Sequence, residues 1–479
     1  NSDARAQGGS AGFSFIGDAG FIGFSVSDLE NNYGLPPGTH GHAHGDEEEE
    51  HGEDEHEEEG HEEDEHEEEV EFVRIDLDKT RYDARGMLRF SDSWIDNIRA
   101  SIGYTDYQHK EIETFADGEA EVGTLYSNEG LEGRMTLERV ATGAWSGVYG
   151  LQWNDTDFSA IGEEAFIPAS AIGSLGFFGV ERFTGGNASV ELGFRVENSE
   201  VDASAGCGYD DTSISLSGSV LYDLNEASNL LFGLSRSERA PTVEELLSNV
   251  DAGTCRQKAD DEDLILHAAT GLLEIGNPNL DQETANNIEL GFRQHAGPVT
   301  GELSAYYNEI DDYIFLDFSG EEFEEQPLAR YLSRDAVFSG LEGRVTMNLL
   351  ETAAGTLEFG LFGDLVRAEF DSGGNVPRIP PAKLGAELRY FGPAWTVHLH
   401  ATRAFAQDDE GELELPTDAY TSVSLYADYH WLLAGDSELT VFLKGDNLLD
   451  EEIRNHASFL KNYAPEPGRG FRVGLRFEY

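Results

Sequence analysis

The sequence predicts an all-β protein, a transmembrane antiparallel β-barrel, and three observations support this prediction. Segments of about ten residues alternate between apolar and polar side chains, as in a strand with one face in lipid and the other in water. The connections between these segments alternate between short and long. No run of 18 or more apolar residues, which a transmembrane helix needs, occurs in the 479 residues.

About nineteen alternating segments follow one another along the chain, and each is about long enough to cross a bilayer when tilted. In the last segment the apolar face carries Phe471, Val473, Leu475, Phe477 and Tyr479. The segments begin near residues 11, 19, 80, 94, 123, 142, 171, 188, 212, 228, 285, 298, 336, 355, 382, 394, 419, 437 and 469.

The connections predict which side of the membrane each strand end faces, because outer-membrane barrels have short periplasmic turns and longer extracellular loops. Short turns are expected near Asp18, Ser91, Ala141, Gly185, Asn225, Ala296, Ala353, Gly392 and Gly435. Long connections are expected over 29–79, 106–122, 156–170, 200–211, 237–284, 310–335, 369–381, 405–418 and 447–468. The alternative, a soluble propeller or sandwich, rarely places nine long loops on one side.

The strand count also predicts that the chain is truncated at its N-terminus. Bacterial single-chain barrels have an even number of strands. Nineteen is odd, and the first strand would enter from the extracellular side. We therefore expect an odd number of further strands before residue 1, of which three would complete a barrel of 22.

The charge of the chain excludes one class of function. Ninety-four acidic against 31 basic residues give a net charge of −63, which repels nucleic acid. No sequence motif of an enzyme is present either: the chain has no P-loop, HExxH, GxSxG or CxxC. We therefore expect neither a nucleic-acid partner nor an enzymatic activity.

The first long connection, 29–79, is rich in histidine and carboxylate. Between His40 and Glu71 it has 19 acidic residues and no lysine or arginine. Imidazole together with carboxylate is the ligand set of zinc and other borderline divalent metals. We predict a flexible metal-capture loop with the ligands His40, His42, His44, Asp46, His51, His56, His61 and His66. The alternative is a solvated acidic segment of low complexity, and composition alone does not select zinc over copper.

Two further pairs of residues are candidates. His398 and His400 are two apart on an expected strand, so they share a face, and the apolar neighbours leave that face to the lumen. They are a candidate relay point for a descending cation, or else ordinary lumenal polar residues. Cys207 and Cys255 lie in long connections on the same side, so we expect a disulfide between them, with zinc–thiolate ligation as the alternative.

Several stretches resemble a known family. They are GFIGFSVSDLENNYGLPPGTHGHAH (20–44), RIDLDKTRYDARG (74–86), RSERAPTVEELLSN (236–249), EIGNPNLDQETANNIELGFR (274–293) and GDNLLDEEIRNHASFLKNYAPEPGRGFRVGLRFEY (445–479). With them the whole chain resembles the barrel of TonB-dependent outer-membrane receptors, most closely the zinc-uptake receptors of the ZnuD type. The RAP and NPNL pieces are typical of the broad superfamily; YGLPPGTHGHAH and NHASFLKNYAPEPGR are narrower.

The resemblance implies a location in the bacterial outer membrane, a 22-stranded barrel and a plug domain that this chain lacks. It implies zinc as the transported ligand, and energy from the TonB-ExbB-ExbD complex acting through that absent plug. It further implies a monomer surrounded by outer-membrane lipid, whose C-terminal strand is read by the barrel assembly machinery.

Two more histidines gain interest from the resemblance. His267 lies between Arg239-Ala240-Pro241 and Asn277-Pro278-Asn279-Leu280, where haem receptors of the superfamily carry a haem-ligating histidine. It is therefore a candidate metal ligand, with haem or iron-complex uptake as the alternative function and an ordinary surface histidine as the third interpretation. His456, in the last long connection, has the same three interpretations.

Overall fold

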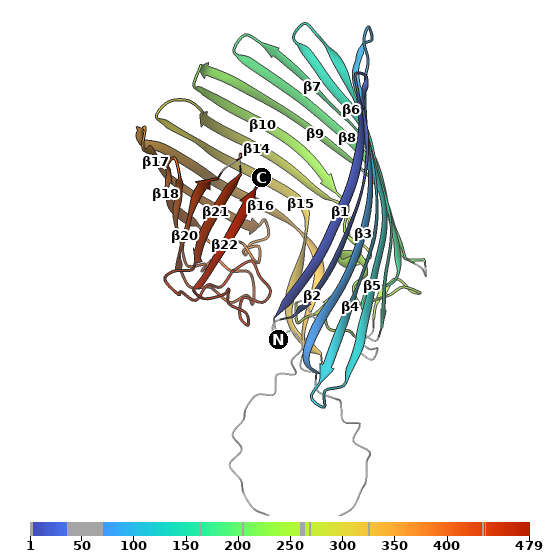
Figure 1. The fold of residues 1–479 in the computed structure, drawn as a ribbon. Coiled ribbons are helices and arrows are strands. Elements are labelled where there is room, and N and C mark those ends of the chain that lie inside the picture. The colour runs from blue at the N-terminus through green and yellow to red at the C-terminus, as the bar shows by residue number, and fades with distance from the viewer. Residues whose placement is uncertain are drawn as a thin grey trace, which may run out of the picture.

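The computed structural model describes residues 3–35, 70–162, 164–203, 206–258, 264–267, 270–323, 326–433, 435 and 437–479. Within these ranges nineteen long strands form one antiparallel sheet, in which each strand pairs with the next along the chain (Figure 1). No helix there is both long enough and apolar enough to cross a membrane.

The first ten strands are β1 (Ala4–Gly17), β2 (Gly20–Gly34), β3 (Val70–Arg89), β4 (Ile95–Phe115), β5 (Ala120–Thr142), β6 (Trp145–Gly162), β7 (Ser170–Gly185), β8 (Ala188–Ala203), β9 (Gly208–Asn225) and β10 (Ser228–Arg239). The other nine are β14 (Glu283–Gln294), β15 (Val299–Phe323), β16 (Gln326–Thr352), β17 (Gly355–Phe370), β18 (Lys383–Phe391), β19 (Trp395–Ala404), β20 (Tyr420–Leu432), β21 (Glu438–Asp446) and β22 (Gly470–Glu478). The predicted nineteen segments are thus confirmed.

Four small elements lie between β10 and β14. They are the helix α1 (Val243–Leu247) and the short strands β11 (Val250–Asp251), β12 (Arg256–Gln257) and β13 (Leu273–Ile275). β13 pairs in parallel with the outer part of β16, which joins this connection to the barrel wall. The sheet curls so that β1 and β22 lie on either side of an opening, and no pairing within the described residues joins them (Figure 1).

The two faces of the sheet have opposite chemistry, as the alternation predicts. Along β14, Ile288 and Leu290 are 47% and 58% exposed, whereas the intervening Glu289 points to the inner face, where Ser304 of β15 bonds to it. The same apolar exposed row continues on the neighbouring strand with Leu303. An exposed apolar band is the surface that lipid covers, so the polar inner face is the lumen.

All nine predicted short turns are found, at one end of the sheet. The opposite end differs from the prediction, because several expected loops are in fact strand. β15 and β16 continue until residues 324–325, and β4 and β5 until 116–119, where loops over 310–335 and 106–122 were expected. β2 and β3 likewise extend into 29–79, as far as Gly34 and from Val70.

The strands are longer than predicted because alternation of apolar and polar residues marks contact with lipid, whereas strand pairing continues beyond the lipid. At about 3.4 Å per residue, a span of about ten residues suffices for the bilayer, whereas β16 has 27. Beyond the membrane a strand needs no apolar face that alternates with a polar one: on β15 the consecutive residues Ile314, Phe315 and Leu316 are all buried. The backbone keeps its ladder there while the sequence pattern that marks the strand is lost.

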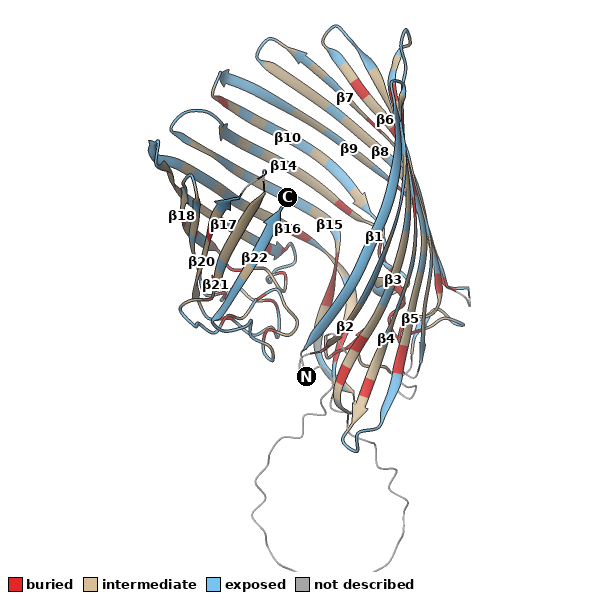
Figure 2. Cartoon of the chain, in the orientation of Figure 1, coloured by how far each residue is buried: buried red, intermediate tan, exposed pale blue. Residues whose placement is uncertain are grey.

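Buried apolar residues gather at the outer end of the barrel, beneath the long connections. One cluster joins Phe166 and Ile167 to Val201 on β8 and to Leu246 and Leu247 on α1. Figure 2 shows exposed and half-exposed stretches along the strands, with many buried positions near the ends that carry long connections. The structure is therefore most firmly packed where extracellular ligands would arrive.

Candidate metal-binding sites

The inner face of the outer part of β4 carries three potential metal ligands. His109, Glu111 and Glu113 alternate with exposed or outward residues, so their side chains share one face. The His109 ring stacks on Tyr126 of β5, with centroids 4.4 Å apart. The site begins as a short period-two ladder of one imidazole and two carboxylates.

Glu113 faces a second carboxyl group, that of Glu164 in the β6–β7 connection. Burial, a hydrogen bond that protonated Glu164 donates to Glu113, and the negative charge of Glu113 raise the pKa of Glu164 to about 8. Gly123 makes room for the pair, because a Cβ there would lie 2.8 Å from a Glu164 oxygen. Glu113 is only 8% exposed, and its Oε1 has no hydrogen-bond partner among the described residues. Two carboxyl groups held this closely need a shared proton or a cation.

His267 approaches this cluster from the β10–β14 connection. Its Nδ1 lies 2.8 Å from Oε1 of Glu274, and its ring packs against Phe166 at 4.7 Å. Glu274 also accepts hydrogen bonds from Thr270 (2.6 Å) and Tyr331 (3.0 Å). Burial alone would raise the pKa of Glu274, but these bonds and His267 hold it below its usual range.

Glu111 links the two groups. Burial raises the pKa of Glu111, while the charge of a protonated His267 acts in the opposite direction. His267 is therefore near enough for its charge to be felt by a carboxylate of the β4 ladder. The carboxylate of Glu274 beside the imidazole favours a cation over haem, which carries anionic propionates.

A second group lies on the lumenal wall farther from the loops. Glu387 of β18 and His398 and His400 of β19 each offer one ligand atom, and these atoms lie within 4.8 Å of one another. Nε2 of His398 is 3.1 Å from Oε2 of Glu387. The predicted inward direction of both histidines agrees with this geometry, and the prediction missed Glu387.

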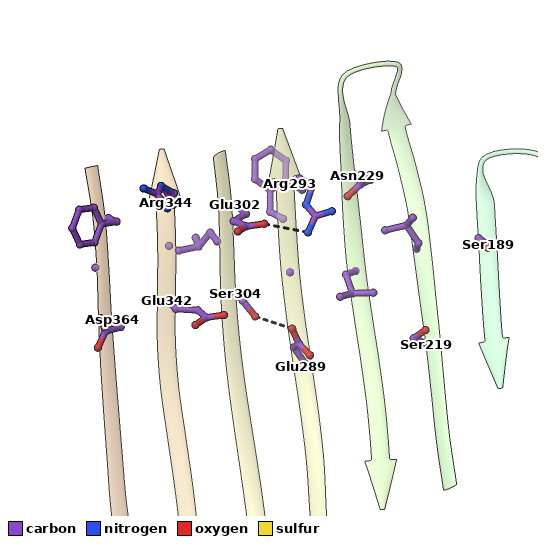
Figure 3. Close-up of a pocket in the computed structure, with 18 of the residues that line it drawn as sticks. Ser189, Ser219, Asn229, Glu289, Arg293, Glu302, Ser304, Glu342, Arg344 and Asp364 are labelled. Carbon is purple, nitrogen blue, oxygen red and sulfur yellow. Dashed lines mark hydrogen bonds and ion pairs between the residues drawn. The ribbon is translucent and has the colours of Figure 1, made fainter. Parts of the chain in front are cut away.

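The wall next to this group is strongly charged. A lumenal cavity of about 910 Å³ is bordered by His400 and by residues of eight other strands. Figure 3 shows Glu342 and Arg344 on β16 beside Asp364 on β17, and the ion pair of Arg293 with Glu302. Polar side chains of both signs on an inner face suit an aqueous path.

His456 lies apart from both groups, and its surroundings are those of a buried ion-pair network. It is 1% exposed, with Nδ1 3.0 Å from the Thr417 hydroxyl and Nε2 3.3 Å from Glu414. Lys461 donates to Glu414 at 2.7 Å. The interpretation as a surface histidine is wrong, because the connections around it close over the ring.

The remaining predicted residues fall into two sets. Cys207 and Cys255 are joined by a disulfide across a Cα–Cα distance of 5.4 Å, which attaches the β10–β14 connection to the β8–β9 connection. The expected ligands of the capture loop lie outside the described residues: His40, His42, His44, Asp46, His51, His56, His61 and His66.

Sequence reasoning missed five carboxylates of the two candidate sites: Glu111, Glu113, Glu164, Glu274 and Glu387. Two of them had a readable signal, because Glu111 and Glu113 follow His109 at the period of a strand. The others come from different connections and strands, and in a chain with 94 acidic residues their positions cannot be recognised from composition.

Comparison with known proteins agrees with the fold. The family model described as TonB dependent receptor-like, beta-barrel matches residues 20–448. Among solved structures, the copper transporter OprC has a TM-score of 0.74 at 14% identity, over 99% of this chain and 72% of that one. The FrpB iron transporter from Neisseria meningitidis (F3-3 variant) has 0.68 at 11%, over 98% and 71%. The ferric enterobactin receptor PfeA has 0.69 at 14%, over 98% and 70%. Identities this low show a shared fold.

Proposed function

Because the chain belongs to the TonB-dependent receptor β-barrel family of the bacterial outer membrane, we propose that it takes up a divalent metal ion, zinc in particular. Receptors of this family are coupled to the TonB system and transport their cargo. We assign the chain to the zinc-uptake branch of the family, the ZnuD-like receptors.

One observation carries the proposal. A buried carboxylate oxygen, Oε1 of Glu113, has no partner among the described residues and lies in a group that includes Glu164. The charges of Glu113 and His267 both act on Glu111, which shares the inner face of β4 with Glu113. A buried carboxylate oxygen without a partner is costly unless a cation or proton compensates it. Imidazole with carboxylates is a ligand set for zinc.

The capture step is proposed for the loop that the sequence singles out. Seven histidines and 18 acidic residues between positions 40 and 69 would raise the local zinc concentration above the barrel. Flanking strands β2 and β3 bring the two ends of this loop to the barrel rim, and β3 adjoins β4, which carries His109, Glu111 and Glu113. Captured ions would therefore be released beside the outer cluster.

Ferric siderophores, haem and copper differ from zinc in size, charge or affinity for these ligands. The similar structures include a copper transporter, an iron transporter and a ferric enterobactin receptor. Ferric siderophore complexes need a wide site, and haem needs room for its propionates. The carboxylates around His267 suit a small cation better. Copper competes for the same ligands and would bind more tightly at equal concentration.

The cellular setting is part of the proposal. The exposed apolar band lies in outer-membrane lipid, and the receptor works as a monomer together with TonB-ExbB-ExbD. The C-terminal strand β22, with Phe471, Val473, Leu475 and Phe477 exposed, is the segment that the barrel assembly machinery would read.

Calorimetric titration of the purified chain in detergent with zinc tests the outer site. We expect His267→Ala and Glu113→Gln each to weaken one class of zinc sites at least about tenfold. His295→Ala is the matched control, because His295 lies in the β14–β15 turn at the opposite end. Zinc binding that is unchanged in both test variants would refute the outer site. A haemin Soret shift that disappears in His267→Ala would favour haem instead.

A further inference from the structure

We propose that Glu387, His398 and His400 form a second divalent-metal site, on the lumenal wall below the outer cluster. The inference deepens the proposed function, because it rests on a metal cargo and locates a point that this cargo meets inside the barrel. The site lies on β18, which carries Glu387, and on β19, which carries both histidines. None of these residues belongs to the outer cluster.

The strand register brings the three ligands together. Glu387 is paired directly with His400 across β18 and β19, and His398 is the next inward residue along β19. Their ligand atoms lie within 4.8 Å of one another. A zinc ion about 2.1 Å from each donor would hold the donors about 3.4 Å apart. Side-chain rotations that move each ligand atom by about an ångström would therefore bring the three donors to zinc-binding distance without moving the backbone.

The surroundings fix two of the three side chains. The His400 ring stacks on Phe362 at 4.9 Å, and its Nε2 is 2.9 Å from the Thr402 hydroxyl. Glu387 is 3% exposed. The His398 side chain is 37% exposed, so it is the member that an ion in the lumen reaches first. A hydrogen-bonding neighbour of a ligating imidazole, such as Thr402 beside His400, sets the orientation and the tautomer of the ring.

Two arginines set the strength of the site. Arg344 lies 2.7 Å and Arg389 3.6 Å from Oε1 of Glu387, which leaves Oε2 to His398. In the absence of metal they neutralise the buried carboxylate. When a divalent ion binds, the same positive charges oppose it, so binding is weak and exchange is fast. A transport path needs intermediate sites that release what they bind.

A purely structural role is the competing explanation. Glu387 already has three cationic or donor partners, and an ion-pair network of this kind holds neighbouring strands together without any metal. The two explanations differ in one measurable property, because only a metal site makes the two histidines respond together to zinc.

Histidine footprinting with diethyl pyrocarbonate, read by mass spectrometry, measures each imidazole separately in the full chain. Zinc alone is the probe. A metal-bound nitrogen has no free lone pair, so modification of an occupied histidine stops. We expect saturating zinc to slow modification of His398 and His400 together by about fivefold or more.

Glu387→Gln should abolish that protection at both histidines. Glu342→Gln is the matched control, because it removes an exposed lumenal carboxylate of β16 and should leave protection unchanged. Absence of zinc protection at His398 and His400, or protection that persists in Glu387→Gln, would overturn the proposal. A Glu387→Asp variant shows whether a carboxylate restores the protection if the glutamine variant folds poorly.

The same experiment separates this site from the proposed function. Protection confined to the histidines between positions 40 and 66 and to His267 would refute the lumenal site and support capture. Protection confined to His398 and His400 would support the lumenal site and refute capture by the loop.

Discussion

At the scale of single residues, the buried carboxylates differ in whether a cation accompanies them. Glu414 has Lys461 and His456 beside it, and Glu274 has His267. Within the part of the chain that the structure describes, Glu113 has only another carboxyl group beside it, that of Glu164. The first two are stabilised within the protein, whereas Glu113 is the one whose charge an external cation would compensate.

Glu414 makes a pH-dependent contribution to stability. Burial opposes its ionisation, but His456, Lys461 and two backbone N–H groups lower its pKa to about 2. Because the folded pKa lies below the unfolded value of about 4.5, the contribution is present above pH 4.5 and is lost as pH falls toward 2. We expect thermal unfolding of the chain in detergent to show this loss, and Glu414→Gln to remove about 3 kcal/mol at pH 7. An unchanged acid profile in that variant would contradict the assignment.

Unlike Glu414, Glu113 is expected to lower the stability of the fold while it contributes to zinc binding. Glu113→Gln removes one of two facing carboxyl groups, so we expect it to stabilise the outer end by about 1 kcal/mol above pH 8, where Glu164 ionises. The same variant should lose zinc affinity. Thermal melts at pH 6 and pH 9, with and without zinc, measure both effects. A variant that is less stable at pH 9 than the unsubstituted chain would show that the pair is not repulsive.

At the scale of elements, the two superfamily motifs are parts of one structure. Arg239 of the RAP motif forms ion pairs with Glu245 and Glu283, and Thr242 caps α1 in a capping box with Glu245. The NPNL motif returns to the same place, where Asn277 N–H donates to the Glu245 carbonyl. The motifs therefore anchor the connection that carries His267.

Gly276 gives this anchor a sharp test. A Cβ at position 276 would lie 2.7 Å from backbone atoms of Leu246 and Leu247 in α1, and backbone cannot rotate away. We expect Gly276→Ala to displace α1, to destabilise the outer end by about 1–3 kcal/mol and to speed proteolysis of the β10–β14 connection. Gly253→Ala is the control, because its nearest neighbour is 3.5 Å away and is a side-chain atom. Equal proteolysis of both variants would contradict this packing.

The sequence predicted the elements well where lipid imposes alternation, and less well elsewhere. Exposed apolar rows such as Ile288 and Leu290 identified every spanning strand and every periplasmic turn. The outer extensions of β15 and β16 were taken for a loop, because the alternation breaks there: the pairing register shifts after Ile310, and the consecutive residues Ile314, Phe315 and Leu316 are all buried. α1, β11, β12 and β13 were missed for a related reason: their pattern is too short to carry a period.

At the scale of the whole molecule, the candidate site could be predicted only in part. His398 and His400 were found by their spacing on one strand, whereas His267 was found by the resemblance, from its place between the RAP and NPNL motifs. Their carboxylate partners come from other connections and strands, and a chain with 94 acidic residues does not mark which ones matter. Strand register brings Glu387 to His400, and loop packing brings Glu274 to His267. Register and loop packing are properties of the folded barrel.

The net charge of −63 bears on the whole path from solution to lumen. A negative surface attracts cations of every kind and raises their arrival rate. Selection of zinc must then come from the imidazoles, because carboxylates alone suit calcium and magnesium. The central claim is therefore that the histidines between positions 40 and 66, and not the acidity of the loop, make capture selective.

The most direct test replaces all seven of these histidines with asparagine in the receptor gene and leaves every carboxylate in place. The measurement is accumulation of radioactive zinc by zinc-starved cells that depend on this receptor. We expect uptake to fall at limiting zinc and to recover at high zinc, where capture is no longer needed. Uptake at limiting zinc that equals that of the unsubstituted receptor would contradict the account.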